Sequence, residues 1–272
     1  MSNNISLVIS DIDGTLITSN HEVTRRTREA AANLYEKGIK LSLASSRPPR
    51  SIRPLAELLG LRSPFAAFNG ALVATAEGEV MADSHIAPEI TARIKAIAND
   101  LGIDVWLYDE SDWYASERTP FVDREEHTSG FSANMDDYNH RITGNLAKLT
   151  VVGKPELVAI AEKKVMSEMA DKISASCSKP RFLDVTAYGM HKGTVVVRLA
   201  EVFGITTNEV AVIGDGPNDV EMFQQAAVSI AMGQAVDEVR AVAGNVTASN
   251  DDEGWARGIE KYVLEAYQSA GI

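Results

Sequence analysis

The length, composition and charge of the chain are those of a folded globular protein. With 272 residues, of which 45% are hydrophobic and 24% charged, it is neither intrinsically disordered nor collagen-like nor a disulfide scaffold. Asp and Glu number 38 against 26 Lys and Arg, and this net charge of −12 weighs against partners that need a basic face, namely nucleic acids and anionic membranes.

The first 60 residues alternate between predicted strands and predicted helices. Apolar residues predict a strand over 5–10, a helix over 23–37, a strand over 40–44 and a helix that begins near Ser51. The same alternation returns late, as a helix over 192–203, a strand over 209–213 and helices over 219–227 and 254–268. This alternation predicts an α/β fold, a Rossmann-like doubly wound sheet with a parallel core.

The middle of the chain has a different pattern. We expect helices over 88–101 and 156–169 and strands over 103–108, 113–116, 148–152, 172–176 and 181–186. Helix–strand–strand occurs twice, which is consistent with a duplicated α+β unit. We therefore place an inserted α+β cap domain at 84–188, and the core at 1–83 and 189–272. Residues 117–147 are polar and aperiodic and receive no assignment.

Cysteine usage and the N-terminal sequence bear on the location of the protein. Cys177 is the single cysteine, so no intrachain disulfide is possible, and a cysteine-ligated zinc site is not expected. The N-terminus lacks a basic region, and no apolar run reaches about 18 residues, so neither a signal peptide nor a membrane span is predicted. We expect a cytoplasmic protein.

Polar side chains follow three of the predicted strands. Ligands of an open α/β sheet bind beyond the carboxyl ends of its strands, so we expect these side chains to form one site although roughly 200 positions separate them. They are Asp11 and Asp13 after the first strand, Ser45 after the second, and Asp215, Asn218 and Asp219 after the third. Each motif alone is also compatible with a turn, a helix cap or a loop hydroxyl.

The acidic residues predict a metal site of oxygen ligands. Carboxylates without a neighbouring histidine or cysteine suit Mg²⁺ rather than zinc. An EF-hand reading of residues 11–22 fails, because Leu16 stands where such a loop requires glycine. We assign Asp11 and Asp215 to the metal, and we expect Asp219 to support these groups from outside.

The same residues predict phosphoryl chemistry. A carboxylate attacks without first losing a proton, so Asp11 needs no partner base and is the candidate nucleophile. Asp13 is the candidate acid and base, a role that requires a pKa above the ~3.9 reference. We expect Ser45 to donate a hydrogen bond to the phosphoryl group and Asn218 to assist it.

Two cations stand at predicted helix starts. A cation in the first turn opposes the helix dipole by roughly 0.3–1 kcal/mol, so Lys192 calls for a compensating anion. A bound phosphate would serve, although a solvated surface lysine is an equally good interpretation of this position alone. Arg47 repeats the pattern before another helix, and with the adjacent Ser46 it completes the candidate substrate-binding residues.

Five segments, taken together, resemble the haloacid dehalogenase superfamily of aspartyl-phosphate-forming phosphatases, and within it the Cof-type sugar-phosphatase-like group. They are Asp11-Ile12-Asp13-Gly14-Thr15-Leu16, Leu43-Ala44-Ser45-Ser46-Arg47-Pro48, Phe68-Asn69-Gly70-Ala71, His191-Lys192-Gly193-Thr194 and Gly214-Asp215-Gly216-Pro217-Asn218-Asp219. The resemblance implies a Rossmann-like core and an α/β cap inserted between the second and third motifs. It also implies Mg²⁺ bound by Asp11, the backbone carbonyl of Asp13, and Asp215.

The chain departs from the family pattern at three positions that bear on substrate fit. Ser46 stands where glycine is usual, His191 where serine is frequent, and Gln234 where asparagine is usual. Candidate contacts to the leaving group in the cap are Trp113, Tyr114, Arg118, Arg124, His127 and Arg181, although core packing or a solvated charge explains each of them as well.

The function predicted from the sequence is that of an enzyme. We expect a Mg²⁺-dependent phosphomonoester hydrolase that acts on a small phosphorylated metabolite, a sugar phosphate or a phosphorylated cofactor, through an aspartyl-phosphate. The alternatives are a phosphomutase and a non-catalytic Mg²⁺-dependent phospho-receiver or ligand-binding protein. A receiver needs neither the inserted domain nor the acid at Asp13. The oligomeric state is not indicated.

Overall fold

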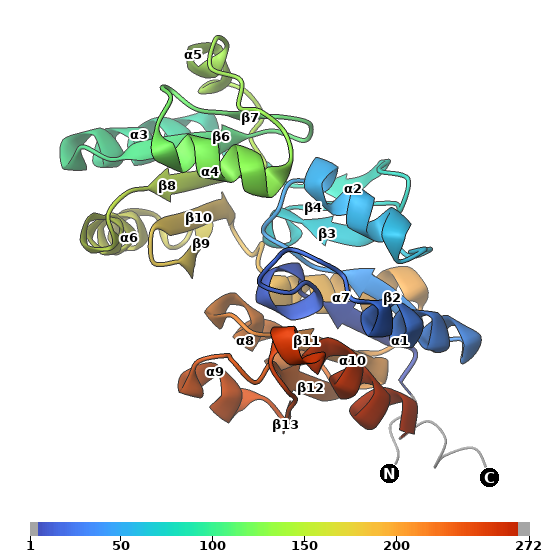
Figure 1. The fold of residues 1–272 in the computed structure, drawn as a ribbon. Coiled ribbons are helices and arrows are strands. Elements are labelled where there is room, and N and C mark those ends of the chain that lie inside the picture. The colour runs from blue at the N-terminus through green and yellow to red at the C-terminus, as the bar shows by residue number, and fades with distance from the viewer. Residues whose placement is uncertain (1–4, 266–272) are drawn as a thin grey trace.

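The computed structural model describes residues 5–265, and they form two lobes (Figure 1). The chain passes from the lower lobe to the upper one at residues 84–87 and returns at residues 188–191. The lower lobe is built on a parallel sheet with the order β13-β12-β11-β1-β2. Its strands are β1 (Leu7–Ser10), β2 (Lys40–Leu43), β11 (Val210–Gly214), β12 (Val228–Ala231) and β13 (Asn245–Val246). The predicted Rossmann-like fold with a parallel core is confirmed.

Helices cover both faces of this sheet because its strands are apolar on both sides. Val8 packs toward α1 and α10, whereas Leu7 and Ile9 pack toward α7 and α8. This alternation follows from the period of two in a strand. The helices of the lobe are α1 (Arg25–Glu36), α2 (Pro49–Leu58), α7 (Lys192–Phe203), α8 (Val220–Gln225), α9 (Asp237–Val242) and α10 (Gly254–Ile259), which continues as a π-helical turn to Leu264.

A small antiparallel sheet connects the lobes. It consists of β3 (Phe65–Ala67), β4 (Leu72–Ala74) and β5 (Val80–Asp83), in that order. A bridge between Ala44 and Ala66 joins its first strand to the end of β2. The segment between β3 and β4 is thereby held next to the loop that follows β2.

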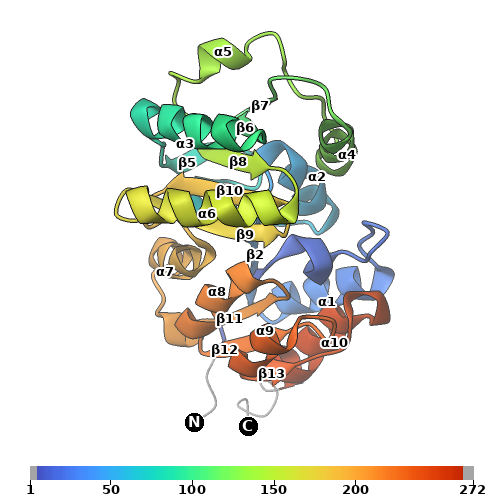
Figure 2. The same cartoon turned by 90° about the vertical axis from the view of Figure 1, so that its left-hand side faces the viewer.

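The upper lobe, which we call the cap, is an antiparallel sheet with the order β7-β6-β8-β10-β9. Its strands are β6 (Asp104–Tyr108), β7 (Trp113–Tyr114), β8 (Lys148–Val152), β9 (Ile173–Lys179) and β10 (Phe182–Ala187). Helices α3 (Pro88–Leu101) and α6 (Pro155–Met169) cover one face (Figure 2). The limits 84 and 188 stay a prediction; the cap strands all lie between them.

The two faces of the cap sheet differ in chemistry. Leu149 and Val151 of β8 point into the apolar core under α3 and α6. Their neighbours Lys148 and Thr150, and Asp184 of β10, therefore lie on the other face, which is turned toward the lower lobe. The polar face of this sheet is an internal surface of the molecule.

Several elements differ from the sequence prediction. The unassigned segment 117–147 contains α4 (Pro120–Ser129) and α5 (Tyr138–Arg141). The ends of α4 carried ordinary signals, because Thr119 caps its start and Gly130 ends it in a left-handed conformation. Strand β7 is shorter and β9 longer than predicted, and a 3-10 turn over Pro217–Asp219 delays the start of α8.

Two further predictions concern the ends of the chain and the membrane. The last part of the helix predicted over 254–268 lies outside the described residues. No described helix combines the length and the apolarity that a bilayer crossing requires.

Candidate active site

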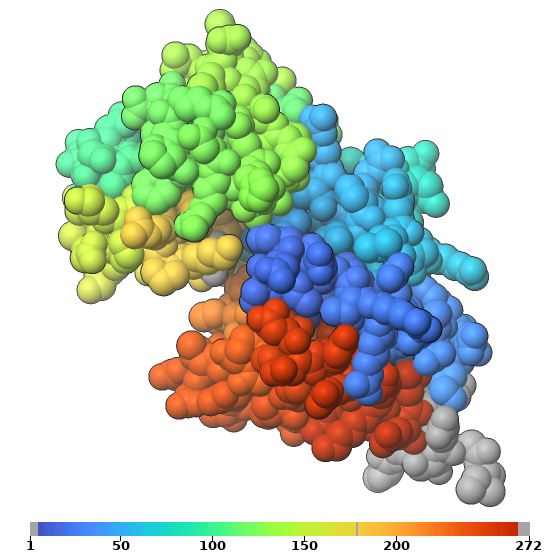
Figure 3. Space-filling view, in the orientation of Figure 1, coloured from blue at the N-terminus to red at the C-terminus, as the bar shows by residue number. Residues whose placement is uncertain are grey.

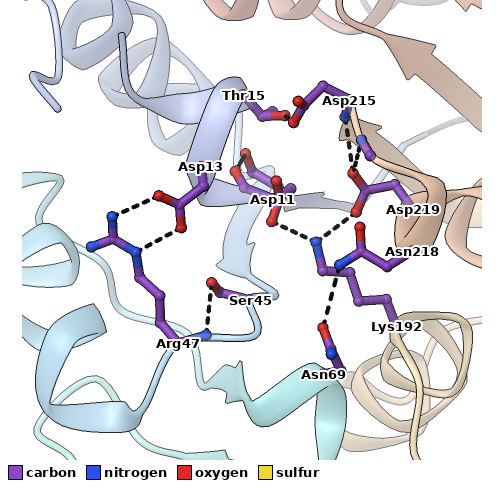
Figure 4. A network of polar contacts seen from close by, with 12 residues as sticks. Asp11, Asp13, Thr15, Ser45, Arg47, Asn69, Lys192, Asp215, Asn218 and Asp219 are labelled. Carbon is purple, nitrogen blue, oxygen red and sulfur yellow. Dashed lines mark hydrogen bonds and ion pairs between the residues drawn. The ribbon is translucent and has the colours of Figure 1, made fainter. Parts of the chain in front are cut away.

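The carboxyl ends of β1, β2 and β11 lie at one edge of the parallel sheet. Ser10 of β1 is paired with Leu43 of β2 and with Ile213 of β11. The residues that follow each strand are therefore at the same level, although the chain separates them widely. Figure 4 shows Asp11, Ser45 and Asp215 gathered there, with Lys192 facing them.

Lys192 is the buried cation of this group. It is the first residue of α7, its side chain is 1% exposed, and its Nζ lies 2.5 Å from Oδ1 of Asp11 and 2.6 Å from Oδ1 of Asp219. Burial lowers the pKa of Lys192, but the two carboxylates outweigh burial and raise it, so the amine is charged. The negative charge that compensates Lys192 at the start of this helix therefore comes from the carboxylates of Asp11 and Asp219.

Both carboxylate oxygens of Asp219 accept hydrogen bonds from neighbouring residues. One of its oxygens binds Lys192, and the other accepts hydrogen bonds from the backbone amides of Asp215 (2.9 Å) and Gly216 (2.8 Å). Its carboxylate is completely buried. Asp219 thus fixes both the lysine and the loop that carries Asp215, which agrees with the supporting position expected from the sequence.

Asp11 and Asp215 form the acidic side of the site. Oδ1 of Asp215 accepts a hydrogen bond from Thr15 (2.7 Å), and oxygens of the Asp11 and Asp215 carboxyl groups lie within 4.8 Å of each other. Burial raises the pKa of Asp11 well above its usual value, and burial together with Asp219 raises the pKa of Asp215 to about 6. Each carboxylate disfavours ionisation of the other, and a cation bound to both would favour their ionised forms.

The donor set at this position fits a hard divalent cation. Asp11, Asp215 and Asp219 each offer an oxygen, and the three oxygens lie within 4.8 Å of one another. Such oxygens without a nitrogen or sulfur donor are the ligands of Mg²⁺ or Ca²⁺ rather than of zinc. Because both Asp219 oxygens already have partners, Asp11 and Asp215 are the carboxylates available to an ion.

Gly14 allows Asp215 to approach the turn after β1. Its φ is +78°, and an added Cβ would lie 2.8 Å from Cγ of Asp215 and closer still to Oδ2. A side chain at position 14 would thus be strained and would also displace the acidic residue. The glycine is needed for both reasons.

Asp13 lies on the opposite side of Asp11 and is paired with Arg47. The guanidinium donates from Nε to Oδ2 (2.7 Å) and from Nη2 to Oδ1 (2.8 Å). Burial would raise the pKa of Asp13, but the hydrogen bonds and charge of Arg47 outweigh burial and lower it. The expectation of a raised pKa is therefore wrong, because the bidentate pairing with Arg47 could not be read from the order of residues.

The remaining predicted binding residues lie around the same centre. Ser45 is buried, and its Oγ accepts a hydrogen bond from the backbone amide of Arg47 (3.2 Å). The Nδ2 of Asn218 is 3.5 Å from Oδ1 of Asn69, a buried residue with φ +54° in the segment between β3 and β4. The backbone carbonyl of Ser46 accepts a hydrogen bond from Lys148 of the cap.

A cavity of about 530 Å³ lies between the lobes, where Figure 3 shows the surface hollowed at their junction. Asp11, Asp13 and Asp215 line it from the core. Polar and aromatic side chains line it from the cap, and the sequence analysis did not single them out: Trp106, Tyr108, Glu125, Lys148, Thr150, Lys179, Phe182 and Asp184.

The cap residues expected to contact the leaving group lie elsewhere. None of the six, all within the described residues, lines the cavity: Trp113, Tyr114, Arg118, Arg124, His127 and Arg181. The two aromatic residues are buried in the cap, and the guanidinium of Arg118 pairs with Asp123 and Glu126 at the surface. For Trp113, Tyr114 and Arg118 the structure fits the alternative interpretations given above, which were core packing and a solvated charge.

Known proteins share this architecture and sequence. The profile of the haloacid dehalogenase-like hydrolases matches residues 8–259, so the chain belongs to that family. A Bacteroides thetaiotaomicron haloacid dehalogenase-like hydrolase superposes with a TM-score of 0.85 at 30% identity, covering 94% of this chain and 99% of that one. The subclass IIB sugar phosphatase BT4131 gives 0.84 at 27% identity, covering 94% and 98%.

Curated relatives cover nearly the whole chain as well. A Bacillus subtilis 5-amino-6-(5-phospho-D-ribitylamino)uracil phosphatase is 24% identical over 96% of both chains, and a Cronobacter sakazakii HMP-PP phosphatase is 22% identical over 85% of both. The predicted family and the predicted enzyme class, a phosphatase of the haloacid dehalogenase type, are thereby confirmed.

Proposed function

We propose that the chain is a Mg²⁺-dependent phosphomonoester hydrolase that forms an aspartyl-phosphate at Asp11. The observation that carries the proposal is the setting of that carboxylate. One of its oxygens is held by Lys192, the carboxyl group lies against Asp215, and the residue lines the cavity between the lobes. Its position is therefore fixed while it remains open to a ligand.

The cation would be held by the carboxylates of Asp11 and Asp215 and by the backbone carbonyl of Asp13. When bound, it would offset the negative charge of a phosphoryl group and of the carboxylates around it. Lys192 carries the fixed positive charge on the other side of Asp11. Ser46, Arg47 and Asn218 line the cavity in which the phosphoryl group would lie, and the buried Ser45 lies behind them with its Oγ bonded to the backbone amide of Arg47.

The residues support a two-step reaction. An oxygen of Asp11 attacks phosphorus, the bond to the leaving alkoxide breaks, and the phosphoryl group remains on Asp11. Asp13 takes up a proton from solvent when Arg47 turns to the phosphoryl group, gives this proton to the alkoxide, and then takes one from the water that hydrolyses the acyl phosphate and releases inorganic phosphate. The phosphoryl group also competes with Asp13 for Arg47, and this competition frees the carboxyl group for proton transfer.

The substrate and the location belong to the same proposal. We infer a small phosphorylated metabolite, because a cavity of about 530 Å³ has the size of small-molecule sites. The relatives named after a ribitylaminouracil phosphate and after HMP-PP, and the sugar phosphatase among the solved structures, support this size class. A cytoplasmic location stays a prediction from the single cysteine.

A panel of phosphomonoesters, assayed with and without Mg²⁺, tests the proposal. We expect inorganic phosphate and the free alcohol in equal amounts, activity that EDTA removes, and recovery of activity with added Mg²⁺. An isomerised phosphate ester in place of free phosphate would identify a mutase instead. No turnover of any ester with Mg²⁺ present would contradict the hydrolase.

Gly14→Ala is expected to reduce turnover by about 100-fold, because a misplacement of about 1 Å at a positioned group costs about that much. The matched control is Gly38→Ala, since Gly38 has a similar φ of +73° but no atom within 4 Å of the added Cβ. Both variants bear the same backbone strain, and the control should keep its activity. Equal activities of the two variants would show that Asp215 tolerates the displacement.

Asp13→Asn is expected to slow hydrolysis of alkyl phosphates by about 10²–10⁴-fold, the usual effect of removing a general acid. Nitrophenyl phosphate should be less affected in its first step, because nitrophenolate leaves without a proton. Single-turnover kinetics on both esters measure the difference. Equal losses on the two esters would argue against proton donation by Asp13.

A further inference from the structure

The cap contributes a buried pair of opposite charges to the cavity. The side chain of Lys148 on β8 is 6% exposed and that of Asp184 on β10 is 3% exposed, and their nearest charged atoms are 3.4 Å apart. Thr150, two residues after Lys148, donates a hydrogen bond to Oδ1 of Asp184 (2.8 Å). All three residues line the cavity, and none belongs to the proposed reacting group.

One oxygen of this pair lacks a partner. Oδ2 of Asp184 is buried and has no hydrogen-bond partner among the described residues. A buried acceptor without a donor destabilises the folded protein, and more so when the acceptor is charged. Because Asp184 lines the cavity, a donor on a ligand can satisfy this oxygen where the protein does not.

Lys148 places the pair next to the phosphoryl site. Its Nζ donates a hydrogen bond to the backbone carbonyl of Ser46 (2.9 Å) and lies 4.2 Å from the ring centre of Tyr108. Ser46 is flanked by Ser45 and Arg47, and the guanidinium of Arg47 pairs with Asp13 at the same end of the cavity as Asp11. A ligand group that binds Asp184 would therefore belong to the leaving alcohol of a phosphate ester whose phosphoryl group lies near Asp11.

Apolar surface adjoins the polar pair. Trp106 and Phe182 line the same cavity, with ring centres 5.7 Å apart. Aromatic faces suit the C–H bonds of a carbon skeleton, whereas Asp184 requires an O–H or N–H. The cap side of the cavity thus matches a leaving group that carries hydroxyls on a carbon framework.

We propose that Asp184, positioned by Thr150 and Lys148, is a specificity-determining residue that accepts a hydrogen bond from a hydroxyl of a sugar or polyol leaving group. The inference rests on the proposed phosphatase function and adds the class of alcohol that is released.

The test compares substrates with and without leaving-group hydroxyls. We would measure kcat/KM of the wild type and of Asp184→Asn for ribose 5-phosphate, glucose 6-phosphate and nitrophenyl phosphate. A hydrogen bond to a charged group is worth about 1.5–3 kcal/mol, so the sugar-to-nitrophenyl ratio should fall about 10- to 100-fold in the variant. Thr150→Val should lower the same ratio by a smaller factor.

Asp109→Asn is the matched control, because Asp109 is also a largely buried carboxylate of the cap, 13% exposed, but does not line the cavity. The sugar-to-nitrophenyl ratio of kcat/KM in this control should equal that of the wild type. An unchanged ratio in Asp184→Asn, or equal losses on all three esters, would overturn this inference while leaving the hydrolase intact. The inference would also be overturned if kcat/KM of Asp184→Asn fell only for 4-aminobenzyl phosphate and not for benzyl phosphate or the sugar phosphates. The hydrogen-bond donor would then be an amine. A wild type inactive on every ester would overturn the proposed function itself.

Discussion

Asp11→Asn is expected to lower turnover by on the order of 10⁴-fold or more while the protein stays folded, because removal of a nucleophile from a multi-residue site has effects of this size. Asparagine has nearly the shape of aspartate, so the hydrogen-bonded surroundings of Lys192 and Asp219 survive. The measurement is nitrophenyl phosphate hydrolysis at saturating Mg²⁺, with circular dichroism as a check of folding. Asp171→Asn, an exposed aspartate after α6, is the control.

The covalent intermediate provides a second readout of the same assignment. In Asp13→Asn, nitrophenyl phosphate should still phosphorylate Asp11, whereas the acyl phosphate should persist because the base that activates water is missing. Acid quench followed by mass spectrometry of the peptide that contains residue 11 detects a mass increase of one phosphoryl group. Near-normal activity of Asp11→Asn, or phosphate on another residue, would assign the nucleophile elsewhere.

Lys192→Met should reduce both stability and activity. Removing one partner of a buried ion pair typically costs about 3–5 kcal/mol, because the remaining charges are left without compensation. Here two carboxylates, those of Asp11 and Asp219, lose their shared cation. In a protein of this size, such a cost lowers the melting temperature by about 10 °C.

The stability loss in Lys192→Met should depend on Mg²⁺. Since a bound cation offsets part of the same negative charge, Mg²⁺ should raise the melting temperature of the variant more than that of the wild type. Differential scanning fluorimetry with EDTA and with Mg²⁺ measures both shifts, and Lys163→Met on the exposed side of α6 is the control. A variant as stable as the wild type without Mg²⁺ would contradict the buried ion-pair network.

The core and its site could be predicted because strand, turn and helix follow one another with local signals. The strands before Asp11, Ser45 and Asp215 are short apolar runs, and a parallel sheet brings their ends together whatever the chain between them does. The pairing of Asp13 with Arg47 was not predictable in this way. It depends on how the loop after β2 turns, and the side-chain direction there has no periodic signal.

The cap residues show why the cap side of the cavity could not be predicted from the sequence. Lys148 and Thr150 alternate with Leu149 and Val151, a pattern typical of a strand with one side in water. In this protein the polar side faces another lobe across a cavity. Periodicity identifies the two faces of a strand, but it does not distinguish bulk solvent from a binding cavity.

The order of strands in the parallel sheet has a consequence for synthesis of the chain. Strand β1 is made first and pairs with β2 soon afterwards, but its other neighbour, β11, is made roughly 200 residues later. At 5–20 residues per second, a ribosome needs about 10–40 s to reach it. During that interval the edge of β1 that pairs with β11 in the folded protein has no partner strand.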